Sequence, residues 1–175
     1  YDPKSKEAQR FFIFLQDKFY HAITKMTASK IILDRADSGE PNMGLTTFKG
    51  NTPTKKEATT AKNYLESKEL RELNLLSEAF LVLAEMLISR GIKMTMSDLQ
   101  LKIDEVLKLH EFDVFGGYEN YLGAKANAKA KKEHNEYMEI LKLQLFDLDV
   151  PFTLENFYNG EYADLKEDLS KISTQ

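Results

Sequence analysis

His21 is the side chain in this sequence whose type and position best suit acid–base chemistry, because histidine titrates near neutral pH. Asp17 precedes it by four residues, so in a helix the carboxylate lies beside the imidazole, orients the ring and favours its protonated form. A general acid or base is built in this way. The same spacing is also typical of a plain surface ion pair, here beside an exposed Phe14, and this commoner explanation stays open.

Arg35 is the second candidate for chemistry. The helical pattern places its stem on the packed side of a short helix, where a guanidinium needs an anion such as Asp17, Asp34 or Asp37. Arg35 either holds the next loop through hydrogen bonds to loop carbonyls or clamps a phosphate or carboxylate of a substrate. The candidate catalytic residues are therefore His21, Arg35 and Asp37.

The loop at 35–49 is polar and contains Gly and Pro, so it is expected on the surface, where binding residues concentrate. Asn42, Thr46 and Lys49 can bind a ligand there, although Asn and Thr are also ordinary turn residues. The glycine spacing comes close to that of a nucleotide-binding P-loop. Leu45 stands where the essential lysine belongs, and a helix precedes the loop, so that motif is excluded.

A possible anion site follows the loop. Thr54 and Glu57 have the spacing of a capping box and predict a helix that runs to about residue 65. Free N–H groups at a helix start attract anions, and several lysines lie close by, although such lysines are often simply solvated. These lysines are Lys49, Lys55, Lys56 and Lys62. The candidate ligand-binding residues are Asn42, Thr46, Lys49 and Lys62.

The elements that must position these residues are helical, because apolar residues recur at three- and four-residue steps and no strand-like alternation is convincing. We expect one all-α domain at 1–147 with about six helices. A tail at 148–175 is irregular, with a short helix at 163–171, and packs on the domain or contacts a partner. The segment 79–84 is apolar on all sides, which predicts a central, covered helix. The expected helices are 5–25, 27–37, 54–65, 67–91, 97–110 and 118–144.

Composition narrows the possible functions. A net charge of −4 argues against a phosphate-binding surface over the whole domain, and zero Cys removes disulfides and thiolate chemistry and fits a cytoplasmic protein. No apolar run is long enough to span a membrane. The three histidines lie too far apart in the sequence to predict a metal site. His110 is expected at a helix end and His134 on a solvent face. No cofactor is expected. The lysines at 125–132 indicate a solvated helix face more than a nucleic-acid surface.

The run RADSGEPNMGLTTFKG at 35–50 carries a family resemblance, together with FYHAITKMTASKII before it and AKNYLESKELRELNLL after it. This region resembles the C-terminal domain of the RhuM-type virulence proteins, which are bacterial proteins encoded near pathogenicity islands and prophages. The resemblance implies an N-terminal winged-helix-like DNA-binding domain ahead of it. The chain starts at Tyr1-Asp-Pro without a Met, so we expect an excised C-terminal domain.

Two functions are compatible with these residues. The first is a regulatory or interaction domain that forms a homodimer or binds a protein partner, with nucleic acid bound through the N-terminal domain; segment 79–84 and the aromatic tail suit such contacts. The second is a toxin or phage-defence enzyme that acts on a nucleotide or nucleic acid through the 35–49 loop. Convergence of His21, Arg35 and Asn42 in one pocket favours the enzyme.

Overall fold

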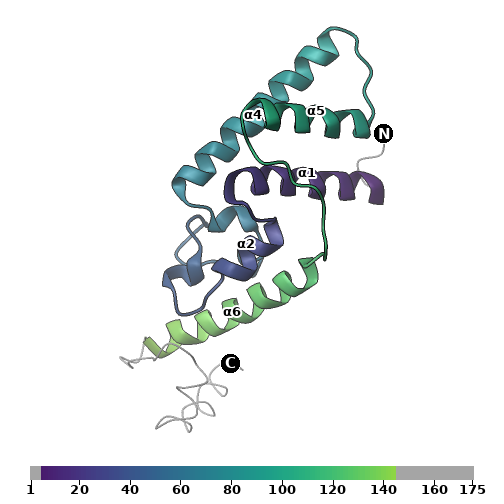
Figure 1. Cartoon of the computed structure of the whole chain (residues 1–175). Helices are drawn as coiled ribbons and strands as arrows, with labels where there is room; N and C mark the ends of the chain where they lie inside the picture. The colour runs from purple at the N-terminus through teal and green to yellow at the C-terminus, as the bar shows by residue number, and fades with distance from the viewer. Residues whose placement is uncertain (1–4, 145–175) are drawn as a thin grey trace.

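The structure is a computed structural model, and it describes residues 5–144. Over these residues it contains six α-helices, two 3-10 helices (η) and no strand, which confirms the all-α prediction (Figure 1). The elements in order are α1 (Lys6–Thr24), α2 (Ala28–Arg35), η1 (Pro41–Gly44), α3 (Lys55–Ala58), η2 (Ala61–Tyr64), α4 (Ser67–Ser89), α5 (Met96–Leu109) and α6 (Gly123–Gln144). The predicted tail at 148–175, with its short helix, lies outside the described residues.

Helix α1 begins and ends where the sequence predicts. The Ser5 hydroxyl accepts a hydrogen bond from the backbone N–H of Ala8 at 3.1 Å, which satisfies one of the free donors of the first turn. Lys25 ends the helix in the left-handed conformation (φ 61°). The apolar stripe of α1 is buried along its length, as Phe11 and Phe19 show. The helix therefore forms one wall of the core.

Helices α2 and α6 pack against each other although about 90 residues separate them in sequence (Figure 1). Ile31 and Ile32 are buried on α2, and the small side chains of Ala126 and Ala130 are buried on α6, which allows the two backbones to come close. Lys129 of α6 donates a hydrogen bond to a carbonyl of α2 at 2.8 Å. This pair forms the lower half of the core.

Helix α5 contacts α1 through a buried charge as well as apolar residues. The Lys18 ammonium lies 2.5 Å from the Asp104 carboxylate, 4.9 Å from the centre of the Phe14 ring and 3.4 Å from the Phe115 carbonyl. The Lys18 side chain is only 4% exposed, so these contacts replace the water that its charge loses. They fix the position of α5 relative to α1.

Two predicted helices are shorter than expected. The helix from Thr54 ends at Ala58 instead of residue 65, because the hydroxyls of Thr59 and Thr60 both donate to the Lys56 carbonyl and favour a turn. Helix α6 starts at Gly123, not at Tyr118. Tyr118, five residues before this start, is instead hydrogen-bonded to Asp17 and packed against Phe14 of α1, and these contacts compete with helix formation.

The prediction that segment 79–84 is central and covered on several sides is wrong. The distal half of α4 extends away from the body of the molecule (Figure 1), and Leu81 and Val82 are 59% and 55% exposed. Only Leu73 and Leu76, in the first half of α4, are buried. Phe80 packs against Phe19 of the core, but the core of the described residues does not explain the apolar side chains of Leu81 and Val82.

Candidate functional site

The 35–49 loop is attached firmly to helix α6. Ser38 is buried; its backbone N–H donates to the Glu133 carboxylate at 2.8 Å and its hydroxyl donates to the Glu136 carboxylate at 3.2 Å. Two charge-assisted bonds from one serine hold the loop where surface loops are usually mobile. The loop is thus part of the packed structure.

The backbone of η1 adopts an uncommon conformation that inserts one apolar side chain into the core. Asn42, Met43 and Gly44 all have positive φ values, of 54°, 51° and 85°. Such values are rare in residues other than glycine, and they persist only where the surroundings enforce them. Met43 is fully buried, and a Cβ on Gly44 would lie 2.2 Å from the Arg35 carbonyl oxygen. The loop is shaped by packing.

Arg35 pairs with an anion that the sequence analysis did not consider. Its guanidinium donates to both carboxylate oxygens of Glu69, at 2.6 and 2.7 Å, and to the Tyr64 carbonyl at 2.8 Å. Within the described residues, the expected partners Asp17, Asp34 and Asp37 form no hydrogen bond with it. The bidentate hydrogen bond raises the pKa of Arg35 and lowers that of Glu69. These contacts support a structural role for Arg35, which joins α2 to the start of α4.

Asp37 and Asn42 also bond within the protein. The Asp37 carboxylate accepts a hydrogen bond from the Gly39 N–H at 2.9 Å, as in an ordinary Asx turn. The Asn42 side-chain oxygen accepts a hydrogen bond from the Tyr137 hydroxyl of α6 at 3.3 Å. Both contacts hold the turn that contains η1 in place.

Of the remaining candidates, Thr46 is hydrogen-bonded within the protein, whereas the side chains of Lys49 and Lys62 face solvent. The Thr46 hydroxyl donates to the Leu65 carbonyl at 2.5 Å, which connects the loop to the residue after η2. The Lys49 backbone N–H donates to the Glu57 carboxylate at 2.7 Å. The Lys49 and Lys62 side chains are exposed, so they are accessible to a ligand from solution.

The helix start at Thr54 is already occupied by a carboxylate of this chain. Glu57 accepts hydrogen bonds from the Thr54 N–H at 2.9 Å and from the Lys49 N–H, and these bonds lower its pKa. Because α3 has only four residues, its helix dipole is also small. The anion expected at this position is therefore the side chain of Glu57.

The predicted Asp17–His21 pair does not form. Asp17 is only 2% exposed and accepts hydrogen bonds from the Ala28 N–H at 2.6 Å and from the Tyr118 hydroxyl. The His21 ring lies against Phe115 at 5.5 Å between centroids, and its buried Nδ1 has no hydrogen-bond partner in the described structure. Asp17 instead links α1 to the first turn of α2 and to the segment before α6.

Asp17 should make the stability of the protein depend on pH. Burial raises its pKa above the ordinary 3.8, against the hydrogen bonds from Tyr118 and Ala28, which lower it. A raised folded-state pKa contributes stability that is complete below the unfolded pKa and is lost as pH rises through the folded one. We expect wild type to lose stability relative to Asp17→Asn as the pH rises. The difference between their unfolding free energies (wild type minus variant), measured by urea titration, should decrease from about pH 3.5 to pH 7. An increase would show that the two hydrogen bonds outweigh burial; Asp34→Asn controls for the lost charge.

His21, Arg35 and Asn42 do not come together. In the described part of the chain, no hydrogen bond or ring contact joins any two of them, and each contacts a different element. The contacts of the described residues therefore do not show the convergence of these three side chains that would favour an enzyme at this loop. Catalytic roles for His21, Arg35 and Asp37 stay a prediction.

Two other predictions, both for histidines, can be compared with the structure. His134, expected on a solvent face, is buried where α6 meets the loop before α3, and its Nε2 lies 2.8 Å from the Pro53 carbonyl oxygen. The prediction was wrong because His134 shares a face of α6 with the buried residues Ala130 and Tyr137. His110 is the C-cap of α5, as predicted.

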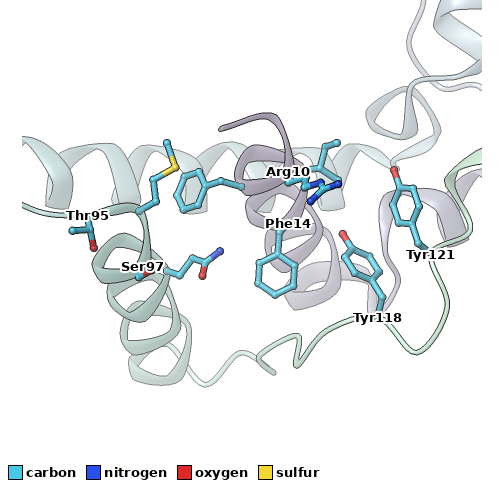
Figure 2. Close-up of a pocket in the computed structure, with 10 residues that line it drawn as sticks. Arg10, Phe14, Thr95, Ser97, Tyr118 and Tyr121 are labelled. Carbon is cyan, nitrogen blue, oxygen red and sulfur yellow. The ribbon is translucent and has the colours of Figure 1, made fainter. Parts of the chain in front are cut away.

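A cleft of about 950 Å³ lies between α1, the start of α5 and the segment before α6, and the sequence analysis missed it. Figure 2 shows Arg10 and Phe14 of α1 between Ser97 of α5 and the tyrosines Tyr118 and Tyr121. The Tyr118 ring packs edge-on against Tyr121 and against Phe14, with centroids 5.4 and 6.0 Å apart. Aromatic rings thus form one side of the cleft.

One signal for the cleft was present in the sequence. The helical pattern places Arg10 and Phe14 on the same side of α1 as Asp17. The cleft could not be predicted because Tyr118 and Tyr121 were assigned to a helix, whereas both precede α6 and the hydrogen bond from Tyr118 to Asp17 holds Tyr118 against α1. A tertiary contact therefore creates the aromatic wall.

The described residues contain no group of three or more His, Cys, Asp or Glu side chains that could hold a metal ion. Within the same residues, no helix combines the length and the apolar character that crossing a bilayer requires. A family model described as "Virulence protein RhuM family" matches residues 1–144 of the chain. No curated protein and no solved structure matches.

Proposed function

Since the chain belongs to the RhuM family of virulence proteins, we propose that it is a regulatory or interaction domain that pairs with a second copy of itself through helix α4. The observation that carries this proposal is the exposed apolar surface that runs along this helix from Leu75 to Met86. Contiguous exposed apolar surface on a soluble protein usually marks a contact site. The proposal also accounts for Ala79 and Val82, which the core of the described residues leaves exposed.

The spacing of the exposed residues on α4 is that of a helix–helix contact. Apolar residues follow one another at steps of four, three and four, which is the repeat that lets two helices pack side by side. Three of the four are more than half exposed, at 56%, 55% and 57% for Leu75, Val82 and Met86. The stripe, which we call the α4 seam, consists of Leu75, Ala79, Val82 and Met86. A second copy supplies an identical seam, and two-fold homodimers are the commonest assemblies.

Pairing of this kind suits the whole protein that the family resemblance implies. We propose that an N-terminal domain binds DNA and that this domain brings two such DNA-binding domains together, because a dimer reads two half-sites at a fixed spacing. The net charge of −4 supports the assignment of DNA binding to the N-terminal domain and of pairing to this one, since an acidic domain is poorly suited to bind a phosphate backbone.

Sedimentation velocity tests the pairing. We expect the wild-type chain to form dimers between about 1 and 100 µM, and Val82→Glu or Met86→Glu to raise the dissociation constant at least about a hundredfold, because a carboxylate would be buried without a partner. Leu101→Glu is the matched control, since Leu101 is 62% exposed but lies on α5. Wild type that stays monomeric, or seam variants that still dimerise like the control, would refute the proposal.

The alternative function, an effector enzyme at the 35–49 loop, has less support. Arg35, Asp37, Asn42 and Thr46 each make a hydrogen bond that shapes or fastens the loop. These bonds support a structural role for the loop more than a catalytic one.

A further inference from the structure

The aromatic side of the cleft between α1 and α5 is accessible. Tyr121 is 60% exposed, and Phe14 is only partly buried. The Tyr118 hydroxyl is committed to Asp17, so its ring is held in one orientation. Rigid rings with a free π-face are suited to stacking against a planar ligand. Isolated aromatic residues on a surface are common, but here three of them meet at a cavity.

Three polar side chains of the cleft have no hydrogen-bond partner among the described residues. Arg10, Ser97 and Gln100 all line it, and none of their side chains makes a hydrogen bond or ion pair with the described residues. Arg10 is also the only charged side chain among the described residues that line the cleft. A guanidinium binds a carboxylate or a phosphate through two parallel hydrogen bonds, and hydroxyl and amide groups beside it can complete the contacts.

We propose that this cleft binds a small planar aromatic anion. Its ring stacks on Tyr121 beside Phe14 and Tyr118, and its single carboxylate or phosphate group is held by Arg10 with help from Gln100 and Ser97. The volume of about 950 Å³ lies within the range of roughly 300–1,000 Å³ that is usual for small-molecule sites. Nucleotides and aromatic carboxylic acids share this chemistry.

Because Arg10 is the single cationic side chain among the described residues of the cleft, the cleft is better suited to a small ligand than to a nucleic-acid strand. Strand binding relies on a groove with many positive charges that follow the backbone. Here the single arginine matches a single anionic group, and the chain as a whole carries a net charge of −4. A bound ligand would contact α1, α5 and the segment that leads into α6, so it would fasten together three parts that are distant in sequence. The proposal is independent of dimerisation, which involves the α4 seam.

Isothermal titration of the 175-residue chain tests the proposal. The probes are AMP and salicylate, which each carry a ring and an anionic group, and adenosine and ribose 5-phosphate, which each lack one of the two. We expect AMP, salicylate or both to bind, and the identity of the one that binds indicates the source of the ligand. Adenosine and ribose 5-phosphate should bind at least about tenfold more weakly than AMP if AMP is bound.

Variants at exposed positions separate this site from adventitious binding. Arg10→Gln should weaken binding at least about tenfold and Tyr121→Leu about five- to tenfold, while the fold, checked by circular dichroism, is unchanged. Arg90→Gln and Phe12→Leu are matched controls, because both residues are exposed and neither lines the cleft. The proposal is overturned if neither anion binds at millimolar concentration, if Arg10→Gln and Tyr121→Leu bind like the controls, or if a short single-stranded oligonucleotide binds more tightly than AMP.

Discussion

Gly44→Ala is expected to lower the free energy of unfolding by roughly 2–4 kcal/mol, because it combines backbone strain with a steric clash. Gly44 has a φ of 85°, which residues with a side chain rarely adopt. A Cβ there would lie 2.2 Å from the backbone oxygen of Arg35, and a backbone atom cannot move aside as the end of a flexible side chain can. Urea unfolding followed by circular dichroism measures the effect.

Gly50→Ala is the control that separates the two causes. Gly50 follows the same loop and has a similar φ of 75°, but a Cβ there would meet nothing within 4 Å. Gly50→Ala therefore introduces backbone strain but no steric clash, so we expect the free energy of unfolding to fall by only about 1 kcal/mol. Equal losses for the two variants would show that the Arg35 carbonyl does not constrain Gly44.

Arg35→Ala is expected to destabilise the protein by about 2–3 kcal/mol. This lies between the values for exposed and fully buried ion pairs, since the side chains of Arg35 and Glu69 are 23% and 19% exposed. The variant leaves the Glu69 carboxylate and the Tyr64 carbonyl without their shared donor. Arg71→Ala, at an exposed position of α4, controls for the loss of a positive charge. A loss as small as that of the control would show that the ion pair contributes nothing.

The same pair gives the Arg35 effect a pH dependence. Hydrogen bonds from Arg35 lower the pKa of Glu69 below its ordinary 4.5. A lowered folded-state pKa contributes stability that is present above the unfolded pKa and is lost as pH falls through the folded one. The difference between wild type and Arg35→Ala should therefore be largest near neutral pH and decrease below about pH 4.5. A difference that stays constant across this range would assign the effect to packing alone.

These variants also test the enzyme hypothesis. If Arg35 acts only by holding the fold, a toxicity or plaque assay should follow stability, and His21→Ala should match wild type as long as it stays folded. Loss of biological activity in a His21→Ala variant of wild-type stability would instead support catalysis at this histidine.

Much of the fold could be predicted because its signals are local. Thr27 accepts a hydrogen bond from the Lys30 N–H, Thr95 caps α5, and Gly91 follows α4 with a φ of 70°. Each of these signals acts within four residues, so the sequence displays it directly. The lengths of α3 and α6 were predicted wrongly because hydroxyl–carbonyl bonds of two threonines, and a contact of Tyr118 with α1, compete with helix formation there.

The candidate site was harder to predict, since its partners lie far apart in the chain. Glu69 is 34 residues from Arg35, Tyr118 is 101 residues from Asp17, and Glu133 is 95 residues from Ser38. Helical spacing relates a residue only to neighbours three or four positions away. It therefore suggested Asp17 as the partner of His21 and could not indicate the true partners.

By itself, the sequence determined the helical class of the chain, most helix ends and its family, because caps, periodicity and a distinctive polar loop are properties of short segments. Only the tertiary structure decided what those segments do. It made the 35–49 loop a packed connection, placed Arg10 beside two tyrosines in a cleft, and left the α4 seam uncovered. The physical reason is that hydrogen bonds, ion pairs and burial depend on which distant segments meet, and that is settled only when the whole chain packs.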